Sequence, residues 1–84
     1  MAESEHPSLT VSFSSFVVGL ATSAMGHLGE GPASSINLEL ARNTIDVLGI
    51  LKEKTEGNLD DEEQRLLDTL LYETRLKFVE KTKD

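Results

Sequence analysis

The apolar residues of this chain recur at helical spacing in three segments, separated by two breaks that contain glycine. In the middle segment, for example, Leu38, Ala41 and Ile45 follow one another at steps of three and four, which places them on one face of a helix. No segment alternates as a strand does, and no stretch is repeated. The predicted helices cover residues of about 12–28, 38–56 and 60–81.

Residues with known preferences for helix ends stand at the borders of these segments. Gly29 and Gly57 follow the first two segments, where a helix commonly ends in a left-handed residue. Each segment is preceded by a residue whose side chain can accept a hydrogen bond from the first turn. The predicted N-terminal caps are Ser12, Asn37 and Asp60, with Ser34 and Ser35 as alternatives to Asn37.

Short links between three helices predict an all-α fold, either a three-helix bundle or a helical hairpin plus one helix. We expect a single helical domain over residues 11–81, a mobile segment over residues 1–10 and a frayed end over residues 82–84. The chain has 84 residues and no cysteine, so its core is small and no disulfide supports it. We therefore expect oligomerisation to complete the fold.

The first predicted helix contains no Asp, Glu, Lys or Arg. One broad side of it is apolar and is expected to face the core, through Phe13, Phe16, Val17, Leu20, Ala21, Ala24 and Leu28. Val18 and Met25 are expected to extend this side. The other side holds small residues at steps of four, four and three, namely Ser15, Gly19, Ser23 and Gly26. Glycine inside a helix costs about 1 kcal/mol relative to alanine, so this ribbon favours close approach of another helix. That helix can belong to the same chain or to a second chain.

A second apolar stripe lies on the third predicted helix, away from much of its inner face. It consists of Tyr72, Leu76 and Val79. Isolated apolar residues are common on protein surfaces, but three at helical spacing exceed what a three-helix monomer needs. Both features favour self-association, and a dimer is the expected state.

The charge of the chain narrows the classes of partner. The net charge is -7, which disfavours nucleic acid and anionic lipid as partners. The longest apolar run, residues 16–28, is shorter than the roughly 20 residues of a membrane-spanning helix. No basic, apolar signal peptide is visible, so we expect a cytoplasmic protein without membrane contact.

Candidate chemistry is sparse, and we predict no catalytic residue, no metal site and no cofactor. His27 stands near a helix end, where a cation suits the helix dipole. Residues 54–58, with Lys54, Thr55 and Asn58, form the most distinctive loop, and with Asp46 they could bind a ligand. Arg42 lies one turn before Asp46, so an ion pair at the surface is the simpler interpretation of Asp46.

The order and spacing of several short motifs resemble one known family. These motifs are Phe13-Ser14-Ser15-Phe16, Leu20-Ala21-Thr22-Ser23-Ala24 with Leu28-Gly29-Glu30, Asn37-Leu38-Glu39-Leu40-Ala41, Thr44-Ile45-Asp46-Val47-Leu48, residues 51–59 and the acidic start of the third helix. Over residues of about 11 to 80 the chain resembles domain of unknown function 1844. The resemblance implies a small bacterial protein and supplies no activity and no functional residue.

These observations favour a non-catalytic helical interaction module that associates with itself through the first helix and docks on another protein. Two alternatives remain. The first is a ligand-binding protein or enzyme that uses residues 54–58 with Asp46, and a pocket joining them to His27 would favour it. The second is an acidic mimic of nucleic acid that binds a basic protein, which predicts binding that weakens steeply with salt.

Overall fold

The computed structural model describes residues 11–31 and 35–83, and within them every element of secondary structure is an α-helix. The helices are α1 (Phe13–His27), α2 (Leu38–Lys54) and α3 (Asp61–Thr82). The predicted all-α class is therefore confirmed. The segment expected to be mobile, residues 1–10, lies outside the described residues, as does Asp84.

Each helix begins directly after the residue whose side chain was expected to cap it. The Ser12 hydroxyl accepts a hydrogen bond from the backbone N–H of Ser15 at 3.0 Å, and Asn37 Oδ1 accepts one from Leu40 at 3.0 Å. Asp60 and Glu63 form a reciprocal pair, in which each carboxylate accepts a bond from the other's backbone N–H, at 2.8 and 3.0 Å. These bonds satisfy N–H groups that have no partner inside the helix.

The helix α2 ends at Lys54, two residues before the expected end at residue 56. The Leu51 carbonyl accepts bonds from both the backbone N–H and the hydroxyl of Thr55, at 2.9 and 2.7 Å. Gly57 then takes a positive φ of 83°, a conformation that glycine adopts at little cost. The chain therefore leaves the helical path inside residues 55–57.

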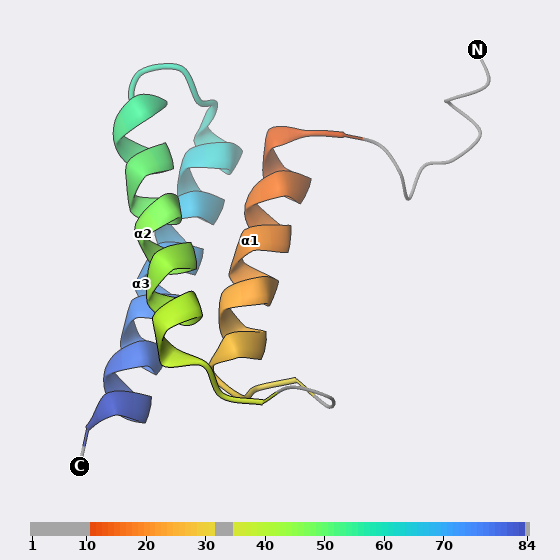
Figure 1. The fold of residues 1–84 in the computed structure, drawn as a ribbon. Helices are drawn as coiled ribbons and strands as arrows, with labels where there is room; N and C mark the ends of the chain where they lie inside the picture. The colour runs from red at the N-terminus through yellow and green to blue at the C-terminus, as the bar shows by residue number, and fades with distance from the viewer. Residues whose placement is uncertain (1–10, 32–34, 84) are drawn as a thin grey trace, which may run out of the picture.

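Consecutive helices run antiparallel, so α1 and α3 point in the same direction (Figure 1). All three pairs of helices are in contact, with α1 packed on both α2 and α3. This arrangement is a three-helix bundle and excludes a hairpin with a detached third helix. None of the helices in the described part of the chain is both long and apolar enough to cross a membrane.

The core lies where the three helices meet. Its buried apolar residues are Val17, Ala21, Ala24 and Leu28 around α1, Ala41, Ile45 and Leu48 from α2, and Leu67 and Leu71 from α3. Thr74 is also buried, and its hydroxyl donates to the Leu70 carbonyl at 2.8 Å. The expectation that Phe16 faces the core is wrong, because its side chain is 51% exposed, and so is the expectation that Val18 extends the core side, because Val18 is 44% exposed. Phe16 is turned about 100° from its neighbour Val17, beyond the arc that two neighbouring helices cover.

Candidate interaction site

The side of α1 that points away from the core is not packed against α2 or α3, and Ser35 lies beside it only at its carboxyl end, near Gly26. Apart from the neighbouring residues and backbone of α1 itself, no atom lies within 4 Å of the place where a β-carbon would stand on Gly19 or Gly26. Ser15 and Ser23 are exposed. The described helices α2 and α3 therefore do not occupy the ribbon of small residues.

Apolar side chains flank this ribbon on both sides. Phe16 stands on one flank, and Val18, 44% exposed, stands on the other. We call this surface the outer face of α1. Its residues are Ser15, Phe16, Val18, Gly19, Thr22, Ser23 and Gly26. These residues span 12 positions of α1, so the face is about 18 Å long, and it carries no charged side chain.

The stripe on α3 is also exposed. Tyr72, Leu76 and Val79 are 66%, 46% and 56% exposed. Ile50, on the outside of α2, is 53% exposed. The stripe thus belongs to a different surface from the outer face of α1.

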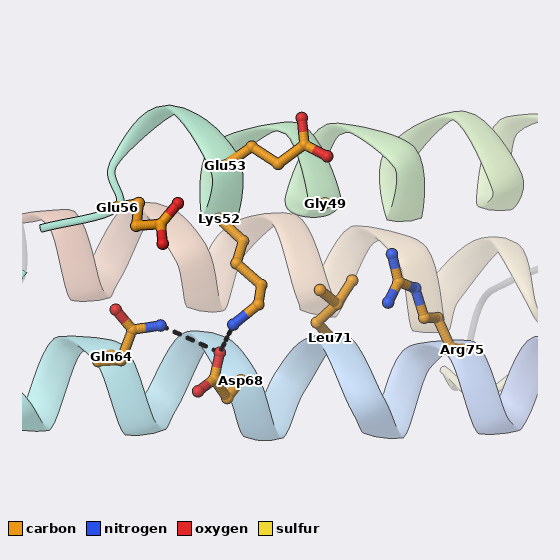
Figure 2. Close-up of a pocket in the computed structure, with 8 residues that line it drawn as sticks. All are labelled: Gly49, Lys52, Glu53, Glu56, Gln64, Asp68, Leu71 and Arg75. Atoms are coloured by element: carbon orange, nitrogen blue, oxygen red, sulfur yellow. Dashed lines mark hydrogen bonds and ion pairs between the residues drawn. The ribbon is translucent and has the colours of Figure 1, made fainter.

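A groove between α2 and α3 opens on the side away from α1, which runs behind it (Figure 2). A hollow of about 490 Å³ at one end is lined by residues of both helices and of the turn that joins them. Lys52 reaches across it from α2, and its Nζ lies 2.5 Å from Asp68 Oδ1 on α3. The Lys52 hydrogen bond lowers the pKa of Asp68, and a further bond from Gln64, at 3.1 Å, acts in the same direction.

A second hollow, of about 310 Å³, continues the groove toward the carboxyl end of α3. Its apolar lining comes from Ile45, Phe78 and Val79. Arg42 and Asp46 line it from α2, and Arg75, which also lines the first hollow, from α3. In Figure 2 the Arg75 guanidinium reaches up from α3 toward Gly49, where a β-carbon would come within 3.1 Å of it.

The expected ion pair between Arg42 and Asp46 does not form. Ion pairs within the described residues are Lys52–Asp68, Lys77–Glu80 and Lys81–Glu30. Both guanidinium groups of the second hollow are therefore without an ionic partner in the described chain. Arg75 could not be singled out from the sequence, because its neighbours across the groove come from α2.

The loop expected to bind a ligand does not assemble a site with its proposed partners. The Thr55 hydroxyl donates to the Leu51 carbonyl, while Lys54 and Asn58 are exposed. Asp46 stands about two turns earlier on α2. His27 closes α1 at the other end of the bundle, with its ring Nε2 3.5 Å from the Ser23 hydroxyl. Within residues 11–31 and 35–83, no cluster of three His, Cys, Asp or Glu side chains could hold a metal ion.

The fold and these surfaces define a small three-helix bundle with one uncharged exposed helix and one charged groove. The chain belongs to the family described as domain of unknown function (DUF1844), whose model matches residues 10–80. The resemblance seen in the short motifs is thereby confirmed. No curated protein and no solved structure matches the chain.

Proposed function

We propose that this protein is a non-catalytic interaction module of the cytoplasm, which forms a homodimer through the outer face of α1 and docks on another protein through α2 and α3. The observation that carries the proposal is the exposure of an entire helix side without a charged residue. Phe16 and Val18 are the apolar contacts of the proposed interface. Ser15, Gly19, Ser23 and Gly26 supply its close packing.

Charge supports α1 as the site of self-association. Two copies, each with a net charge of -7, repel one another over most of their surfaces. The outer face of α1 is the place where two helices can meet without bringing like charges together. A twofold axis through this face would make the interface self-complementary, as is usual in homodimers.

The two glycines support close packing in this interface. Each costs about 1 kcal/mol in a helix interior relative to alanine, and the monomer offers no compensation, because open space surrounds both positions. A partner helix whose backbone approaches closely would offset this cost with added van der Waals contact.

Sedimentation velocity at micromolar concentration tests self-association. We expect a species of twice the 9.2 kDa chain mass for the wild type, and a 9.2 kDa species for Gly19→Leu, whose side chain blocks close approach. Asn43→Leu is the matched control, since it adds the same side chain to an exposed position of α2. Circular dichroism checks that both variants remain helical. A wild type that sediments as a single 9.2 kDa species overturns the proposed dimer.

A further inference from the structure

The distribution of charged residues along the groove between α2 and α3 indicates which kind of partner it can bind. At one end, Arg42 and Arg75 face a hollow with an apolar floor. Asp46 is the single acid that lines this hollow, so two positive groups outnumber one negative group. At the other end, Glu53 and Glu56 line the first hollow and form no ion pair with the described residues. The first hollow is also lined by the Lys52–Asp68 pair and by the shared Arg75, so its three acidic groups outnumber its two basic groups. The groove therefore has an excess of one positive charge at one end and of one negative charge at the other.

The arrangement of the helices indicates the shape of the occupant. The helices α2 and α3 bury one side of their pair against α1, and the groove on the opposite side has no helix in it (Figure 2). Two antiparallel helices form a channel in which a further helix packs by ridges and grooves. Such a helix would convert three helices into a four-helix bundle.

We propose that the groove binds an amphipathic helix of a partner protein, which places an acidic side chain between Arg42 and Arg75 and a basic side chain beside Glu53. The apolar side of the partner helix packs on Ile45, Phe78 and Val79. This proposal rests on docking to another protein, the second half of the proposed function, and is independent of self-association.

The spacing of the charges sets a requirement on the partner helix. Arg42 and Glu53 are 11 positions apart on α2, which is about 16 Å along its axis. The acid and the base of the partner helix are therefore about three turns apart. An unpaired guanidinium over an apolar floor favours a carboxylate, because it can donate two parallel hydrogen bonds.

Two synthetic peptides of about 18 residues, or about 27 Å as helices, test the proposal. Both carry leucines at helical spacing and a lysine near one end, with a glutamate about 11 residues away in the first peptide and a second lysine in its place in the other. Fluorescence anisotropy measures their binding. We expect the glutamate peptide to bind about tenfold more tightly than the lysine peptide.

Charge reversal in the groove identifies the site. Arg75→Glu should weaken binding of the glutamate peptide about tenfold and strengthen binding of the lysine peptide, and Arg42→Glu should act in the same direction. Arg65→Glu is the matched control, since Arg65 is exposed on α3 and lines neither hollow. Its affinities should stay within about twofold of the wild type.

Several results would overturn the proposal. The first two are equal binding of the two peptides and no binding of either peptide. The third is an equal effect of Arg65→Glu and Arg75→Glu on binding. The fourth is displacement of the glutamate peptide by inorganic phosphate, which would indicate a simple anion site. Sedimentation of the same samples tests self-association separately from peptide binding in the groove. A dimer that binds neither peptide refutes the groove alone, and a monomer that binds the glutamate peptide refutes the dimer alone.

Discussion

At the scale of the residue, Asp68 links α3 to α2 through its ion pair with Lys52. Its carboxylate accepts hydrogen bonds from Lys52 and Gln64, and the bond from Lys52 lowers its pKa below the ordinary value of 3.8. The unfolded chain thus takes up a proton at Asp68 at a higher pH than the folded chain does. The stability that the ion pair adds is complete above the ordinary pKa and is lost as the pH falls through the lower, folded pKa.

Asp68→Asn should therefore destabilise the bundle near neutral pH and have no effect in strong acid. We expect a melting temperature lower by at most about 4 °C at pH 7, because the pair is exposed and surface pairs contribute little. Thermal denaturation followed by circular dichroism, repeated as the pH is lowered through the ordinary pKa, measures the difference. A difference that persists unchanged below the folded pKa would contradict this account.

Thr74 is a buried polar residue whose hydroxyl bonds only within its own helix. It donates to the carbonyls of Leu70 and Leu71, at 2.8 and 3.1 Å. Thr74→Val removes the donor and leaves no buried donor without a partner. We expect the free energy of unfolding to stay within about 1 kcal/mol of the wild type, as measured by urea denaturation. A loss well beyond that would show that the hydroxyl holds more than its own helix.

At the scale of the element, the start of α3 is stabilised by the reciprocal bonds of Asp60 and Glu63. Asp60→Ala removes one acceptor and should lower the free energy of unfolding by about 1 kcal/mol. Asp61→Ala is the control, because Asp61 lies in the same first turn and only its charge favours the helix dipole. Urea denaturation of both variants measures the difference, and equal losses would argue against the cap.

At this scale, the features that could be predicted from the sequence are those that depend on residues close together along the chain. The caps of all three helices were predicted because their hydrogen bonds join residues only three positions apart. Phe16 was misplaced because the arc of α1 that becomes buried depends on where α2 and α3 lie. Arg75 was missed for the same reason, since the space it enters is left by Gly49, 26 positions earlier. That no other helix packs on Gly19 and Gly26 also could not be predicted from the sequence, because it depends on how the three helices pack.

At the scale of the whole molecule, the two proposed surfaces should respond to salt in opposite ways. Raising the ionic strength from 0.01 M to 0.1 M shortens the screening length from about 30 to about 10 Å. Self-association should tighten, about two- to fivefold, because salt screens the repulsion between acidic chains that meet at an uncharged face. Sedimentation at the two salt concentrations measures this change, and weaker association at higher salt would place the interface on charged residues.

Binding of the glutamate peptide in the groove should weaken over the same range, because opposite charges attract there. Anisotropy titrations at the two salt concentrations measure this change. Arg75→Glu serves as the control, since it removes the attraction and should reverse the trend. An affinity that is independent of salt would contradict the assigned role of the two arginines.

Residue 11 precedes α1 and residue 83 follows α3. Since α1 and α3 run in the same direction, these residues lie at opposite ends of the bundle (Figure 1). A probe at residue 11, next to the start of α1, would report whether two copies of α1 run parallel or antiparallel. Two such probes would lie within about 10 Å in a parallel pair and about 20 Å or more apart in an antiparallel pair. The chain has no cysteine, so Val11→Cys, at a side chain that is 92% exposed, gives a unique attachment point for a spin label and keeps the Ser12 cap. One distance measured by electron spin resonance would then show whether the two α1 helices of the proposed dimer run parallel or antiparallel.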